Sequence, residues 1–216
     1  MKIFDKNGVQ LLDVQVSDES YRYREIMSTP TLTLYFQLNE FTELPVGAYT
    51  DFKGERFYLF DTLNFIKNGN EDFSHTLIMH GVAERLNRYR FYDFVNGGLI
   101  FSLTAFPADH IAMLVNVLNE KDGGGWSVGT VEDMAEIVVN YNHNSCMEAL
   151  CMMADEAETE FEVTKEKVIN FRKTEYNKVD PLSIAYGKGN GLKPGVQRKN
   201  DDNKRPIERL YVQGGT

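Results

Sequence analysis

Polar and apolar residues alternate along the first part of the chain. The clearest run covers residues 31–38, in which the leucines and Phe36 fall on one face and the Thr, Tyr and Gln residues fall on the other. The side chains of a strand point alternately to its two faces, so a period of two is typical of a strand with one buried face. The pattern therefore predicts a half-buried strand at residues 31–38.

Short turns separate further runs of this kind. Asn7-Gly8 predicts a tight type I′ hairpin over residues 2–16, because both residue types tolerate the positive φ angles of that turn. Two more strands are expected on either side of Lys53-Gly54. Residues 73–94 predict one long strand, or two strands that bend around Gly81.

The first hundred residues thus contain five or six predicted strands and no predicted helix. Residues 68–72 add another turn between two of these strands. Short strands at regular spacing are typical of a small barrel or sandwich. We expect a β-barrel domain at residues 1–97, with its boundary at Asn96-Gly97-Gly98.

The period changes between residues 99 and 171, where a strand–helix–strand unit is written twice. In each copy the helical run carries one apolar stripe at i, i+3, i+4 and i+7 spacing. The stripes are Ile111, Leu114, Val115 and Leu118 in the first copy and Met147, Leu150, Cys151 and Ala154 in the second. Each helix should cover one side of a sheet, which predicts an α+β domain at residues 98–180.

Local signals mark the ends of the two helices. Pro107 suits the first turn of the first helix, and the glycines at residues 123–125 end that helix. Ser145 and Glu148 form a Ser-x-x-Glu capping box at the start of the second helix. The fold class predicted from all of these patterns is α+β and β-rich: a small barrel followed by two amphipathic helices on strands.

The last segment, residues 181–216, is rich in glycine. Between Tyr186 and Arg209 it holds seven Lys or Arg residues against three acidic ones, and it ends in the strand pattern and glycine turn “RLYVQGGT”. We expect a basic, irregular segment that leads to a return strand. The abrupt end of this pattern predicts that the sequence is an N-terminal piece of a longer protein with further domains.

Composition and charge exclude several classes of protein. Apolar residues make up 42% and charged residues 25% of the 216 residues, which is ordinary for a globular protein. The net charge of -9 disfavours binding to nucleic acid through phosphate neutralisation. No apolar run reaches the roughly 20 residues of a membrane span, and the N-terminus lacks the apolar region of a signal peptide.

Residues that could carry chemistry do not form a convincing site. Cys146 and Cys151 are five residues apart on one helix, about 140° apart around its axis, so we expect two free thiols in the core. His75, His80, His110 and His143 do not have the spacing of metal ligands. We therefore expect no metal site and no cofactor.

Three further motifs are weak for the same kind of reason. Ser127 fits the pattern G-x-S-x-G, but it follows a helix and enters a strand, whereas a nucleophile elbow has the opposite order. The glycines of residues 186–191 precede Pro194 and not a helix, so a phosphate loop is disfavoured. Asp155 and Glu158 share a predicted helix face without an apolar pocket. We expect no catalytic residue in this chain.

Acidic residues gather between residues 132 and 162, where Lys and Arg do not occur. One interpretation is an ordinary solvated helix face. The other is an acidic surface that faces a partner or a passing polyanion. The candidate acidic face consists of Glu132, Asp133, Glu136, Glu148, Asp155, Glu156 and Glu158.

Several phrases of the sequence occur in an order that resembles a known family. They are “TPTLTLYFQLNEFTELPVGAYTDFKGERFYL”, “FSLTAFPADHIAMLVNVLN” with “GWSVG”, “YNHNSCMEALCMMADEAETEFEV”, “LSIAYGKGNGL” and “IERLYVQGG”. Together they resemble the N-terminal hub module of phage and prophage tail proteins, often labelled prophage endopeptidase tail or tail-associated lysin. The resemblance covers essentially the whole chain.

The resemblance implies a structural role in a virion. Members of this family look like a barrel domain followed by an α/β-decorated barrel domain, and they form a homotrimeric ring under the tail tube that joins it to fibres or to a puncturing device. DNA would pass through the ring without specific binding, and the acidic face would line the channel. Any lysin or peptidase activity would lie in C-terminal regions. The protein would be made in a bacterial cytoplasm from a phage or prophage gene and would reside in the tail tip or baseplate hub.

A ring also needs surfaces that join its subunits, and two aromatic-rich stretches supply candidates. The candidate subunit contacts are Phe57, Tyr58, Phe60, Phe65, Tyr89, Phe91 and Tyr92. Two other functions stay open: a tail lysin or endopeptidase in which this piece itself cuts the cell wall, and an adhesion module that binds a receptor or carbohydrate. The first requires a cleft with convergent titratable groups, and the second requires exposed aromatic side chains along a groove.

Overall fold

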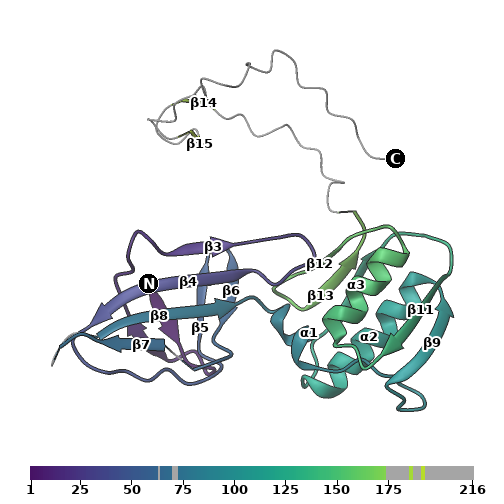
Figure 1. Ribbon diagram of the computed structural model, residues 1–216, viewed down its shortest axis with the longest axis horizontal. Helices are drawn as coiled ribbons and strands as arrows, with labels where there is room; N and C mark the ends of the chain where they lie inside the picture. Colours follow the sequence, from purple (N-terminus) through teal and green to yellow (C-terminus); the bar gives the residue numbers. More distant parts are fainter. Residues whose placement is uncertain (63, 70–72, 174–184, 187–190, 193–216) are drawn as a thin grey trace, which may run out of the picture. The chain divides into compact units, whose positions relative to one another are not determined.

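The computed structural model of the chain describes residues 1–62, 64–69, 73–173, 185–186 and 191–192. The chain divides into two compact units, Met1–Tyr176 and Asn177–Thr216. Of the second unit, the described part is a parallel pair of two-residue strands, β14 (Ala185–Tyr186) and β15 (Gly191–Leu192). The basic segment predicted there lies otherwise outside the described residues. The first unit holds the sheets and helices treated below (Figure 1).

The first unit begins with an eight-stranded sheet. Its strands are β1 (Lys2–Phe4), β2 (Gln10–Asp13), β3 (Tyr21–Tyr23), β4 (Thr31–Leu38), β5 (Tyr49–Phe52), β6 (Glu55–Tyr58), β7 (Asn64–Lys67) and β8 (Phe73–His80). They pair in the order β2-β1-β5-β6-β8-β4-β3, with β7 beside β8. This path is open among the described strands, so the expected barrel closure is not part of the pairing. The pairing between β6 and β8 is short and consists of the single residue pair Tyr58–His80.

The predicted hairpins are present, and one of them uses a different turn. Lys53 and Gly54 both have positive φ, 49° and 82°, which is the type I′ turn that joins β5 to β6. In the first hairpin Gly8 has φ 85°, but Asn7 does not share a positive φ. The Asp5 carboxylate accepts hydrogen bonds from the backbone N–H groups of Asn7 and Val9, which favours a longer turn with a bulge over the type I′ turn.

The first core lies on one face of this sheet. The strand predicted at residues 31–38 is β4, and its Leu32, Leu34 and Phe36 are buried as expected. β4 pairs along its full length with β8, antiparallel and without a break in register. Buried Ile3, Leu44, Phe57, Leu77 and Met79 complete this core.

The prediction of a strand beyond Gly81 is wrong. β8 ends at His80, and residues 84–88 form a short helix, α1 (Glu84–Arg88). Gly81 fits at this change of direction because it has no side chain. A Cβ atom at this position would lie only 2.6 Å from the Cγ of Pro30 and would clash with it. Five residues are too few to show a helical stripe, and Leu86 is the buried side chain of this helix. The alternation of polar and apolar residues in β8 therefore suggested that the strand continues past Gly81.

The strand–helix–strand unit written twice is confirmed. The first copy is β9 (Ile100–Ala105), α2 (Pro107–Lys121) and β10 (Ser127–Val131), and the second is β11 (Ile137–Asn142), α3 (Cys146–Glu156), β12 (Phe161–Val163) and β13 (Val168–Phe171). Corresponding strands of the two copies pair with each other. β9 pairs antiparallel with β11 over six residues, and β10 pairs in parallel with β13, which also pairs with β12. The result is a β-rich α+β fold.

The helix signals are confirmed in detail. Pro107 is the first residue of α2, and Gly123 follows its end with φ 75°. The Ser145 hydroxyl accepts a hydrogen bond from the Glu148 N–H at 3.1 Å, and the Glu148 carboxylate accepts one from the Ser145 N–H. Ile111 and Leu150, from the two apolar stripes, lie in a second core that also contains Val82, Leu86 and Phe91.

The two cores change over between Met79 and Val82, within the unit Met1–Tyr176. The domain boundaries expected near residues 97 and 180 stay predictions. The β9–β11 pair lies next to α2 and α3 (Figure 1). These two helices cover one face of the pair, and the other face carries exposed side chains.

Candidate functional site

The acidic residues predicted as one face are all exposed. Glu132, Asp133 and Glu136 lie on the connection between β10 and β11, whereas Glu148, Asp155 and Glu156 lie on α3. Glu158 follows α3 and does not share its helical face with Asp155, because the helix ends at Glu156 and Glu158 has φ 48°. That these carboxylates line a channel stays a prediction.

The aromatic residues predicted as subunit contacts fall into three groups. Phe57 and Phe91 are fully buried in the two cores, so they are not available to another subunit and leave the candidate set. Tyr58, Phe60, Tyr89 and Tyr92 are half-buried, and Phe65 is exposed. Aromatic side chains occur both in cores and at interfaces. Their presence in the sequence therefore did not show which of the two they would form.

The most densely connected polar cluster in the described chain surrounds Asp122, the residue that caps the C-terminal end of α2. Its carboxylate pairs with Arg85 of α1 at 2.6 Å and with Lys167, which precedes β13, at 2.8 Å. The Tyr89 hydroxyl and the Trp126 Nε1–H also donate hydrogen bonds to it, at 3.0 and 2.8 Å. The Asp122 side chain is 2% exposed, so these partners replace nearly all of its hydration.

The partners determine the charge state of this carboxylate. Burial by itself raises the pKa of Asp122, but hydrogen bonds from Lys167, Trp126 and Arg85 outweigh it and lower the pKa below its ordinary value. Tyr89 responds in the opposite direction: burial and its hydrogen bond to Asp122 raise the pKa of the phenol. Asp122 is therefore held as an anion between two cations.

This cluster also joins the eight-stranded sheet to the second region. The Arg85 guanidinium lies over the rings of Tyr58 and Phe60, 5.4 and 5.8 Å from their centroids, while it pairs with Asp122. It connects the end of β6 to the end of α2. Sequence reasoning missed the cluster because its members come from distant positions and have no shared spacing. One signal could have pointed to it: Asp122 lies just beyond the end of a predicted helix and four positions before Trp126, the only tryptophan of the sequence.

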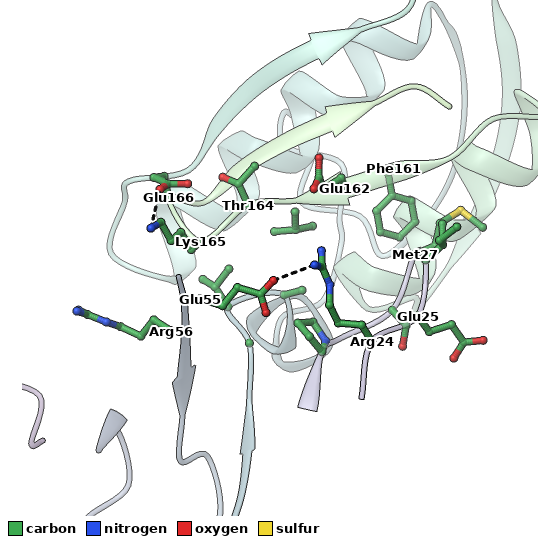
Figure 2. A pocket seen from close by; sticks show the side chains of 17 residues that line it. Arg24, Glu25, Met27, Glu55, Arg56, Phe161, Glu162, Thr164, Lys165 and Glu166 are labelled. Atoms are coloured by element: carbon green, nitrogen blue, oxygen red, sulfur yellow. Dashed lines mark ion pairs between the residues drawn. The ribbon is translucent and has the colours of Figure 1, made fainter. Parts of the chain in front are cut away.

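A groove of about 420 Å³ lies beside the junction of the two cores. The connection from β3 to β4 lines one side, and β12 with the turn that follows it lines the other (Figure 2). Arg24 reaches across this groove to Glu55 of β6 at 3.1 Å, and Lys165 lies 3.8 Å from Glu166. Apolar side chains, including Met27 and Phe161, form part of the lining. The groove can hold a chain segment or a small molecule with both polar and apolar groups.

The weaker motifs have structural places. His75 is buried, stacks on Phe36 at 5.1 Å and lies with its Nδ1 3.0 Å from the Phe73 carbonyl. His110 lies with its Nδ1 2.8 Å from the Tyr141 hydroxyl, and burial lowers the pKa of this imidazole. Ser127 is exposed at the start of β10, after α2. Cys146 and Cys151 are both free, and burial raises the pKa of Cys146 to about 12.

The described residues do not contain a group of three or more His, Cys, Asp or Glu side chains that could hold a metal ion. The glycine motif at residues 186–191 lies mostly outside the described residues. None of the helices in the described ranges is both long enough and apolar enough to cross a membrane.

The fold is similar to that of three solved prophage and phage-like tail proteins. The prophage tail protein gp18 of Listeria monocytogenes EGD-e matches with a TM-score of 0.64 and 9% identity, over 87% of this chain and 54% of that one. The tail protein of Neisseria meningitidis MC58 matches with 0.57 and 8%, over 88% and 56%. The 43 kDa tail protein of prophage MuSo2 from Shewanella oneidensis matches with 0.53 and 9%, over 86% and 57%.

Identity at this level shows a shared fold and nothing finer. No protein-family model matches the sequence, and no curated protein matches it either. The chain spans a little more than half the length of the solved structures that it matches. Its fold is therefore the fold found in prophage tail proteins, and its role is a matter for proposal.

Proposed function

We propose that this protein is a structural component of a phage or prophage tail, placed at the tail tip or baseplate hub. The observation that carries the proposal is the fold shared with three tail proteins over more than four fifths of the chain. In this role the protein forms a homotrimeric ring that connects the tail tube to distal fibres or to a puncturing element. The ring works by holding its shape and not by catalysis.

Two features of the described chain suit such a role. The exposed carboxylates between Glu132 and Glu158 occur without a neighbouring Lys or Arg in the sequence, so a channel that they line would repel DNA and let it slide. The Asp122 cluster ties β6 of the eight-stranded sheet to the end of α2 through Arg85, which suits a part that must transmit force without changing shape. Exposed Phe65 and half-buried Tyr58, Phe60, Tyr89 and Tyr92 remain as candidate contacts between subunits.

The test is to locate the protein in purified tails. Tails from an induced lysogen that carries this gene are imaged by cryo-electron microscopy, and cross-linked peptides are identified by mass spectrometry. We expect three copies around the tail axis at the tip. Purified tails that lack the protein, or that hold it outside the tip, would contradict the proposal.

The alternative of a cell-wall-degrading lysin is tested on the same protein. A zymogram of the full chain against bacterial cell wall should show no cleared band. A cleared band would contradict a purely structural role, and substitution of the exposed Ser127 and His143 would then show whether either residue takes part in the cleavage.

A further inference from the structure

The pair of β9 and β11 is the smallest sheet of the first unit, and among the described strands the outer edge of each of its two strands has no partner. β9 pairs with β11 at all six residues from Ile100 to Ala105, and the described strands offer it no second neighbour. A sheet of two strands is below the size that is stable by itself. An additional strand at the free edge would enlarge it.

The backbone of β9 offers alternate residues to such a neighbour. The Leu99 carbonyl accepts a hydrogen bond from the His143 N–H, which belongs to the same antiparallel pairing. Because bonding alternates along an antiparallel pair, Ile100, Ser102 and Thr104 direct their N–H and C=O groups away from β11. These are the groups that a further strand would bond.

The core is also open at this edge. On β11 the inward-facing Ile137, Val139 and Tyr141 are buried, whereas the inward-facing Phe101 and Leu103 of β9 are only half-buried. β11 also lacks a second neighbour among the described strands, and its inner face is nevertheless buried, so β9 is the less covered of the two edge strands. A strand added beside β9 would cover Phe101 and Leu103.

The edge carries none of the devices that proteins use to prevent pairing. Exposed edge strands are usually protected by charges, proline or a bulge. The sequence of β9, IFSLTA, has no charged residue and no proline, and its pairing with β11 has no break in register. Ile100 and Phe106 are 67% and 50% exposed on either side of it.

We propose that the free edge of β9 binds a second copy of this chain, which adds its own β9 in antiparallel orientation to make one continuous four-stranded sheet. The occupant is a second copy because the edge is complementary to itself. With Leu103 on the two-fold axis, Ile100 lies opposite Phe106 of the other copy, and Ser102 lies opposite Thr104. Each apolar side chain therefore faces an apolar one, and each hydroxyl faces a hydroxyl. Each chain carries a net charge of -9, and this uncharged strand allows two copies to approach.

This contact goes beyond the proposed ring. A pairing of β9 with β9 is two-fold, whereas a three-fold ring needs a head-to-tail contact between different surfaces. The two contacts therefore use different parts of the molecule and can be tested separately.

The test compares the mass of the full chain in solution with that of Ser102→Pro, by sedimentation velocity over a wide range of concentrations. The Ser102 N–H points away from β11, so proline removes a bond to the second copy and leaves the pairing within the chain intact. We expect the wild-type chain to form dimers, and the variant to dissociate with a Kd at least about tenfold higher. Trp126 fluorescence and circular dichroism show whether each variant is folded.

A second variant keeps the test decisive if proline disturbs the fold. Ser102→Lys places a charge on β9, and Asn140→Lys is the matched control, because Asn140 lies opposite Ser102 on β11, on the same exposed face but one strand away from the free edge of β9. We expect the first to weaken the dimer and the second to leave it. A wild-type chain that stays monomeric, or a dimer that both Ser102 variants leave unchanged, would overturn the proposal. A trimer insensitive to these variants would also overturn it and would leave the ring proposal standing.

Discussion

The two regions of the first unit use charge in different ways. In the eight-stranded sheet Arg56 and Asp51 form a surface ion pair, 2.8 Å apart with 41% and 53% of their side chains exposed. In the α+β region Asp122 is almost completely buried and pairs with two cations. Surface pairs contribute little to stability, whereas a buried pair that loses one member leaves an uncompensated charge. The difference predicts that the second region depends on a few polar residues and that the first does not.

Asp122→Asn tests this dependence most directly. The substitution keeps the shape of the side chain but leaves Arg85 and Lys167 without their carboxylate, so we expect the free energy of unfolding to fall by about 3–5 kcal/mol. Urea unfolding followed by Trp126 fluorescence measures it, since the indole donates to the same carboxylate. A loss no larger than that of a surface substitution would show that the cluster is not a stabilising junction.

The same variant has a defined pH dependence. The pKa of Asp122 is lowered in the folded chain, so its contribution to stability is present above the pKa of an unfolded aspartate and is lost as the pH falls through the lower folded value. We expect the difference between wild type and Asp122→Asn to be full at neutral pH and to shrink in strong acid. A constant difference down to strong acid would contradict a role of the ionised carboxylate.

A pair of truncations tests whether the two cores unfold together. Leu77→Ala in the first core and Leu114→Ala in the second each remove a fully buried side chain, and each should cost about 2–5 kcal/mol. Because Arg85 connects the regions, we expect both variants to shift the same unfolding transition of Trp126. If Leu77→Ala changed the circular dichroism of the sheet while leaving the Trp126 transition in place, the two cores would be independent.

Removal of the helix cap gives a smaller effect confined to the second region. Ser145→Ala removes the hydroxyl that accepts from the Glu148 N–H, which should cost about 1 kcal/mol. Ser127→Ala is the control, because Ser127 is exposed at the start of β10 and makes no cap. Equal midpoints of thermal unfolding for the two variants would show that the capping box contributes nothing.

Loss of the surface pair gives the smallest effect. Asp51→Asn should lower the free energy of unfolding by less than about 1 kcal/mol, since both partners are solvated and their interaction is screened. A urea titration beside that of Asp122→Asn measures the contrast between the two regions. Comparable losses for the two substitutions would remove the distinction with which the comparison began.

The parts of the fold that follow from local patterns were predictable from the sequence. The period of residues 31–38, the stripes of α2 and α3 and the Ser145–Glu148 box each involve residues close in sequence, and each is present in the structure. The helix α1 was missed because it is too short to show a period. Closure of the first sheet was expected from the number of strands, but strand number alone does not fix whether the ends of a sheet pair.

The candidate sites were harder to predict for a physical reason. Asp122 gathers partners from residue 85 to residue 167, and such a cluster exists only after the chain has folded. Phe57 and Phe91 show the converse problem, because aromatic residues suited to an interface are equally suited to a core. The seven acidic residues are exposed, and both interpretations of them, a solvated face and a channel lining, require that exposure.

The pairing of corresponding strands across the repeat has a consequence for synthesis of the protein. β10 bonds in parallel to β13, whose first residue, Val168, pairs with Ser127, the first residue of β10. A ribosome adds residues one after another, so β10 leaves the exit tunnel some forty positions before its partner. During that interval its backbone is an open edge, and the second core closes only once Phe171 has emerged. A chaperone that binds extended segments would therefore find its target between β10 and β13 in the nascent chain and not in the folded protein.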